Sequence, residues 1–201
     1  MQSFVLRCLA CNAGIIASYP LETLKVSQQT NKEVKMMAGI EAPVIFSSFT
    51  NGIRFHIFNT LNPYSYVFAL ILAGTVNGIL EYPYQTTKLK LQLNQTKLFP
   101  GGQSIIFFKE LFGTILHFYL YGLLTHEYSS DLEICLYGGL SAAIGMTIVY
   151  PYDTIFVNYK TNNIPPMVTI QNKHLWKGYF YNLLRTFVGY GVTMLFQSKI
   201  I

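Results

Sequence analysis

One seven-residue pattern occurs three times and constrains the fold more than any other feature. Each copy opens with tyrosine and proline and places a polar or acidic residue two positions after the proline; the copies span 19–25, 82–88 and 150–156. The prolines Pro20, Pro83 and Pro151 are 63 and 68 residues apart, and each follows an apolar run long enough for a helix. A repeat of this length predicts three copies of one structural unit.

Composition indicates a membrane protein. Charged residues make up 11% and hydrophobic residues 51% of the 201 residues, whereas soluble domains carry about 25% charged residues. Mean hydropathy is +0.33. The net charge of +5 is spread between the apolar segments, with no dense basic run. An anionic membrane surface is therefore favoured over nucleic acid as the partner.

Six apolar segments predict an all-α membrane protein, with six transmembrane helices in a single domain of residues 1–201. Three pseudo-symmetric two-helix repeats cover approximately 1–62, 63–128 and 129–201. Proline removes a helix hydrogen bond, so each odd helix is expected to be kinked there without stopping. The expected spans are 4–19, 44–61, 66–82, 102–124, 134–150 and 176–197, with a short surface helix at 31–40.

The motifs resemble those of the mitochondrial carrier family. In that family, odd helices end with Pro-x-acid-x-x-base and even helices begin with aromatic-base-Gly. The resemblance implies six helices around a central cavity in the mitochondrial inner membrane, with the three polar loops on the matrix side, as the positive-inside bias also indicates. The matching stretches are Pro20-x-Glu22-x-x-Lys25 followed by Gln29, Tyr150-Pro151-Tyr152-Asp153, Trp176-Lys177-Gly178 and Asn182-Leu183-Leu184-Arg185.

The resemblance implies a ring of ion pairs that closes the matrix end of the cavity. Glu22 is expected to face Lys88, and Asp153 to face Lys25. Charges at this depth are costly unless they are paired. At the third position Gln85 faces Phe156, so one of the three pairs is missing. The implied gate residues are Pro20, Glu22, Lys25, Gln29, Pro83, Gln85, Lys88, Pro151 and Asp153.

The opposite end departs from the family pattern. Related even helices end with aromatic-acid-x-x-base, but Tyr121-Gly122 and Phe196-Gln197 contain no acid. No ionic cytosolic gate is therefore expected. The aromatic-base-Gly motif is intact only at 176–178. The stretches 49–52 and 99–102 match it only in part. We expect one corner there that binds membrane lipid, namely cardiolipin, through a helix N-terminus, formed by Trp176, Lys177 and Gly178.

Counting seven and eight positions past the even-helix glycines gives the positions that face the substrate in the family. Starting from Gly52, Gly102 and Gly178, the resemblance implies substrate binding by Asn59, Thr60, Lys109, Glu110 and Arg185. Ionisable residues at membrane depth are functional candidates by default. The alternative is that Arg185 pairs with Glu110 and holds the bundle together.

The remaining reactive side chains do not favour an enzyme. Cys8 and Cys11 lie in an apolar helix without a second pair, as small packing residues do. His56 and His117 have no suitably spaced partner, so structural hydrogen bonds are favoured over metal binding. With no nucleophile–base pair, phosphate loop or metal-ligand spacing, we predict no catalytic residue, metal or cofactor.

Two functions fit these observations. The missing third pair and the missing cytosolic ring favour a carrier-fold protein with impaired transport. Such a protein would serve as an accessory subunit of an inner-membrane assembly, such as a respiratory complex, with other inner-membrane subunits as partners. The alternative is a functional carrier that exchanges a small anionic or zwitterionic metabolite by alternating access.

Overall fold

The computed structural model describes residues 2–95, 97–125, 130–171 and 175–199. Within them every regular element is helical. The elements are α1 (Gln2–Thr30), the π-helical turn η1 (Pro43–Ser47), α2 (Ser48–Leu61), α3 (Tyr66–Leu93), α4 (Gln103–Leu124), α5 (Asp131–Asn162), α6 (Pro166–Gln171) and α7 (Tyr179–Ser198).

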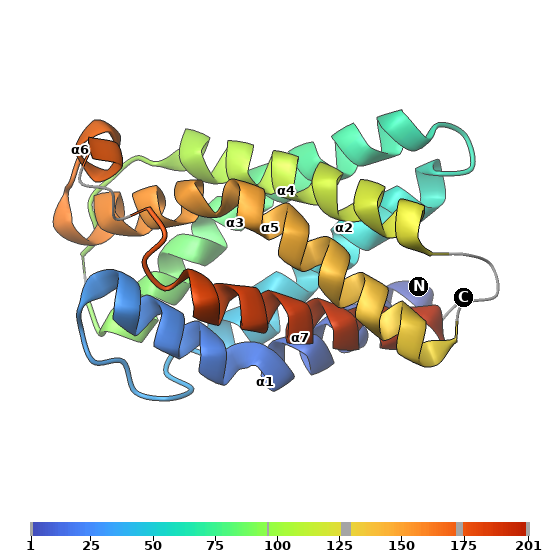
Figure 1. Cartoon of the computed structure of the whole chain (residues 1–201), viewed down its shortest axis with the longest axis horizontal. Helices are drawn as coiled ribbons and strands as arrows, with labels where there is room; N and C mark the ends of the chain where they lie inside the picture. Colours follow the sequence, from blue (N-terminus) through green and yellow to red (C-terminus); the bar gives the residue numbers. More distant parts are fainter. Residues whose placement is uncertain (1, 96, 126–129, 172–174, 200–201) are drawn as a thin grey trace.

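The long helices form a closed ring, which Figure 1 shows from the side. Each of α1, α2, α3, α4, α5 and α7 packs against its neighbour in the chain, and α7 returns to pack against α1. We call the end of the ring where α1, α3 and α5 finish the loop end, and the end where they begin the terminal end. The chain's N- and C-terminal parts both lie at the terminal end.

Three of these helices have the length and apolar character to cross a membrane: 4–30 in α1, 66–93 in α3 and 131–162 in α5. The all-helical part of the prediction is confirmed for the described residues, and three helices are candidate membrane spans. Helices α4 and α7 have 22 and 20 residues, close to the roughly 20 that a crossing requires. That six helices cross the membrane stays a prediction.

The odd helices are longer than predicted. They continue through Pro20, Pro83 and Pro151 and end at residues 30, 93 and 162, whereas the predicted spans ended at 19, 82 and 150. The first residues of the polar segments that were predicted after the prolines belong to these helices. Lys25 and Lys88 are buried there, 3% and 7% exposed, because their charges find partners inside the ring.

The predicted surface helix at 31–40 is wrong. Residues 32–39 contain no α-helix, and Asn31, Met37 and Gly39 have φ of +53°, +66° and +72°. Left-handed residues interrupt a right-handed helix. The chain instead makes a tight return into η1 and α2, which together cover 43–61, close to the predicted second span. Among the described loop-end segments, the third repeat carries the short helix α6.

Glycines let neighbouring helices approach closely. Gly74 and Gly78 on α3 pack against Leu111 and Phe107 of α4, where an added Cβ would lie about 3 Å from their atoms. The tightest approach joins α1 to α7. A Cβ on Gly14 would lie 2.2 Å from Thr193 Oγ1 and 2.3 Å from the carbonyl oxygen of Gly189. Small residues are what membrane helices use for such contacts.

We expect Gly14→Ala to destabilise the ring, because the carbonyl of Gly189 belongs to the main chain and cannot rotate away. The expected loss is about 1–3 kcal/mol, as for other overpacked sites, seen as a lower Tm of the detergent-solubilised protein. Gly113→Ala is the matched control, since its Cβ would meet only ordinary contacts of 3.5 Å. Equal Tm values for the two variants would contradict the packing of α1 on α7.

Candidate functional site

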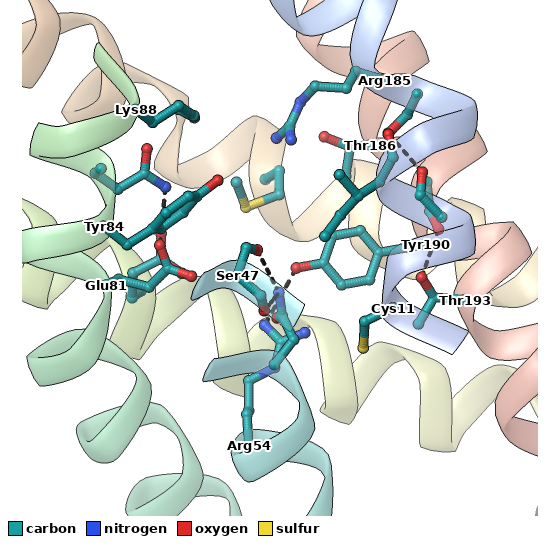
Figure 2. Close-up of a pocket in the computed structure, with 18 of the residues that line it drawn as sticks. Cys11, Ser47, Arg54, Glu81, Tyr84, Lys88, Arg185, Thr186, Tyr190 and Thr193 are labelled. Carbon is teal, nitrogen blue, oxygen red and sulfur yellow. Dashed lines mark hydrogen bonds between the residues drawn. The ribbon is translucent and has the colours of Figure 1, made fainter. Parts of the chain in front are cut away.

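A cavity of about 90 Å³ lies inside the ring, with room for a few water molecules (Figure 2). Its lining is unusually charged for a membrane interior, because five cations and three acids contribute to it. They are Lys25, Arg54, Lys88, Lys109, Arg185, Glu81, Glu110 and Asp153. Charges at this depth mark solute pathways or internal ion pairs.

Both expected ion pairs are present toward the loop end. Lys88 Nζ lies 2.8 Å from Glu22 Oε1, and Lys25 Nζ lies 2.6 Å from Asp153 Oδ2. Gln29 donates to the same Asp153 carboxylate, 3.2 Å away. These side chains are almost fully buried. Each pair joins two different odd helices and so ties the repeats together.

Two predicted substrate residues also bind these carboxylates. Arg185 Nε lies 2.8 Å from Glu22 Oε2, and Lys109 Nζ lies 2.8 Å from Asp153 Oδ1. Lys109 also lies 3.2 Å from Glu110, which accepts a bond from Asn77. The alternative pairing of Arg185 with Glu110 is therefore wrong. We call Glu22, Lys25, Lys88, Lys109, Asp153 and Arg185 the charged cluster.

The third boundary between odd helices lacks an ion pair, as the sequence predicted. Gln85 donates to Glu81 at 3.0 Å and does not bind Phe156. Phe156 packs instead in an apolar cluster with Val26, Leu89, Ile106 and Val157.

A second ring consists of three tyrosine hydroxyls, one from each copy of the repeated pattern. Each hydroxyl accepts a hydrogen bond from the side chain nine positions after the proline of a neighbouring repeat. The sequence reading assigned these tyrosines no role. The bonds are Gln92 Nε2 to Tyr19 (3.2 Å), Lys160 Nζ to Tyr82 (3.0 Å) and Gln29 Nε2 to Tyr150 (3.2 Å).

The same hydroxyls also bind the connections between the odd and even helices at the loop end. Each donates to the main-chain carbonyl just before the glycine that precedes the even helix of its own repeat. The three glycines Gly39, Gly102 and Gly178 all have left-handed φ, between +72° and +85°. The donated bonds run from Tyr19 to Ala38 (2.7 Å), from Tyr82 to Gly101 (3.0 Å) and from Tyr150 to Lys177 (2.5 Å).

This pattern corrects the register of the first repeat. Gly39, and not Gly52, is the counterpart of Gly102 and Gly178, and Gly52 lies inside α2 against Cys8. Positions counted from Gly52 are therefore displaced. Asn59 is half-buried and Thr60 is exposed, and neither lines the cavity. Counting eight positions from Gly39 gives Ser47, which does line it.

Apolar side chains from several helices pack together toward the terminal end. Phe118 stacks on Phe58 with ring centroids 4.1 Å apart and meets Phe55 edge-on at 5.3 Å. Cys11, Leu70 and Met194 pack into the same core, with Tyr66 and Tyr121 beside it. We call Phe55, Phe58, Tyr66 and Phe118 the aromatic cluster. It occupies the end where the sequence lacks the acids of an ionic gate.

Sequence reasoning missed Arg54 and Glu81. Arg54 is 3% exposed, and its guanidinium lies 5.1 to 5.6 Å from the ring centres of Phe55, Phe118 and Tyr190. Its Nη1 donates to the Tyr190 hydroxyl at 3.2 Å. Within the described chain, neither Arg54 nor Glu81 makes an ion pair. Counting from Gly52 passed over Arg54.

The predicted lipid corner forms a compact surface group. Trp176 is 50% exposed and stacks on Tyr150 with ring centroids 6.0 Å apart. Gly178 caps α7 at its N-terminus, and Lys177 donates to the side chain of Asn31. Cardiolipin binding at Trp176, Lys177 and Gly178 stays a prediction.

Comparison with known proteins supports a distant relationship to carriers. No family model matches the chain. The chain is similar to the mitochondrial arginine transporter BAC2 of Arabidopsis thaliana, with 29% identity over a match that covers 44% of this chain and 40% of the relative. The match thus spans less than half of either protein. With the apolar helices, it points to a mitochondrial membrane protein related to transporters rather than to enzymes.

We expect Tyr19→Phe and Tyr150→Phe each to destabilise the loop end, because each removes one accepted and one donated bond in a buried site. The expected loss is about 1–3 kcal/mol for the partners left unsatisfied, measured as a lower Tm. Tyr64→Phe is the control, since Tyr64 is 86% exposed. Tm values equal to that of the unmodified protein in both buried variants would contradict the tyrosine ring.

Proposed function

We propose that this protein is a solute carrier of the mitochondrial inner membrane that exchanges a small charged metabolite by alternating access. The observation that carries the proposal is a charged internal cavity that lies between the charged cluster and the aromatic cluster. The charged cluster closes the loop end, and the aromatic cluster closes the terminal end. In this proposal the six long helices correspond to the six transmembrane helices of the carrier fold.

The missing cytosolic ion pairs were the main argument for a protein that no longer transports. An apolar constriction also closes a pathway, because it excludes water and ions without any charged group. The aromatic cluster is such a constriction. Alternating access requires two closures of comparable strength, and an apolar closure can balance a charged one. The absence of acids therefore does not argue against transport.

The charged cluster can also couple solute binding to opening of the loop end. Lys109 and Arg185 each hold a carboxylate that also pairs with Lys25 or Lys88. A solute anion that draws Lys109 and Arg185 away removes one cation from each carboxylate. A ligand shifts such an equilibrium by its differential affinity for the two states.

Uptake into liposomes tests the proposal. We expect the purified protein to exchange a labelled solute from a panel of L-amino acids, carboxylates, phosphate and nucleotides; L-arginine is included because the relative is named as an arginine transporter. Arg185→Gln and Lys109→Gln should lower exchange at least about tenfold, as loss of a buried charge contact does. Lys32→Gln, at an exposed lysine, is the control.

Failure of the unmodified protein to exchange any member of the panel would contradict the proposal. The accessory-subunit hypothesis makes a separate prediction, that the protein migrates with a large assembly on native gels of gently solubilised mitochondrial membranes. Migration as a small free protein, together with exchange in liposomes, would reject that hypothesis.

A further inference from the structure

The cavity contains two opposite charges for which the described residues supply no ionic partner. Arg54 lies on α2 and Glu81 on α3, and both line the cavity outside the charged cluster (Figure 2). Leaving a buried charge without an ionic partner is strongly destabilising. A pair of such charges facing one cavity indicates a ligand that carries the complementary charges.

The free atoms of Arg54 specify the shape of the anion. Nη1 is used by Tyr190, whereas Nε and Nη2 have no hydrogen-bond partner within the described residues. Nε and Nη2 lie on the same edge of a guanidinium, and that edge takes a carboxylate through two parallel hydrogen bonds. The surrounding rings of Phe55, Phe118 and Tyr190 hold the guanidinium plane in position.

Glu81 supplies the opposite charge. Its carboxylate accepts hydrogen bonds from Thr50 at 3.2 Å and Gln85 at 3.0 Å, which orient it without neutralising it. Thr50 and Arg54 are four residues apart on α2, so they share one face about 6 Å apart along the axis. Glu81 is thus bonded to the turn of α2 that precedes Arg54. A ligand with a neighbouring ammonium and carboxylate would carry the two complementary charges.

We propose that Arg54 and Glu81 form the recognition site for an α-amino acid. Arg54 binds the α-carboxylate through Nε and Nη2, and Glu81 binds the α-ammonium. This proposal deepens the carrier function proposed above and rests on it. The side chain of the amino acid then extends into the cavity toward the charged cluster.

The test measures ligand binding by the rise in Tm of the purified protein in detergent, since a ligand that binds the folded state stabilises it. Each of the twenty L-amino acids is assayed at the same concentration. For the amino acid with the largest effect, the decarboxylated amine and the deaminated acid are assayed next. We expect each analogue to bind at least about tenfold more weakly, because it leaves one buried charge unpaired.

Charge and geometry are separated by two variants. Arg54→Lys keeps the charge but loses the two-donor edge, so affinity for the amino acid should fall at least about tenfold. In Glu81→Gln, the ratio of the affinity for the amino acid to the affinity for its deaminated acid should fall toward one. Arg7→Lys is the matched control, because Arg7 is a buried arginine bonded to Gln197 that does not line the cavity. Its affinity should be unchanged.

Outcomes that overturn this proposal are distinct from failure of the carrier function. If no amino acid raises Tm while phosphate, a nucleotide or a dicarboxylate is exchanged in liposomes, the carrier function stands and the amino acid site is wrong. The site is also wrong if amine and amino acid bind equally well, or if Arg54→Lys binds as tightly as Arg7→Lys. If no solute is exchanged at all, the carrier function itself fails.

Discussion

The structure depends on two buried carboxylates, each held by more than one cation. Glu22 is shared by Lys88 and Arg185, with Lys25 3.9 Å away, and Asp153 is shared by Lys25 and Lys109. An isolated charge in the interior of a membrane protein is destabilising, whereas a paired one is tolerated. The three odd helices therefore stay together at the loop end because separating them would leave these charges alone. The same contacts extend to the even helices α4 and α7, which carry Lys109 and Arg185.

The threefold pattern organises the contacts around that ion-pair network. Each repeat contributes a tyrosine before its proline, a partner nine positions after it, and a left-handed glycine ahead of the even helix. These positions are equivalent in the three repeats even where the residue types differ. The partner is a lysine at Lys160 and a glutamine at Gln29 and Gln92. A hydrogen bond to a tyrosine hydroxyl can come from an amide or an ammonium, so the geometry persists despite the substitution.

The sequence was sufficient to predict the helical repeat from the period of the proline motif, and the pairs Glu22–Lys88 and Asp153–Lys25 from the resemblance to the carrier family. It was insufficient for Gly39, which lacks the aromatic and basic residues that mark Gly178. The spacing from proline to glycine was the available signal, since 20 to 39 equals 83 to 102. The wrong choice of Gly52 moved the count to Asn59 and Thr60, away from Ser47. The aromatic cluster depends on packing between helices distant in sequence, which no local motif records.

The loss of one ion pair has a mechanical consequence. Two boundaries between odd helices are joined by an ion pair and a tyrosine bond, whereas the boundary between α3 and α5 is joined by the Lys160–Tyr82 bond and the apolar packing of Phe156. Separating α3 from α5 therefore breaks no ion pair across that boundary. The three boundaries are unequal in strength, so in the proposed transport cycle the opening of the loop end would depart from threefold symmetry.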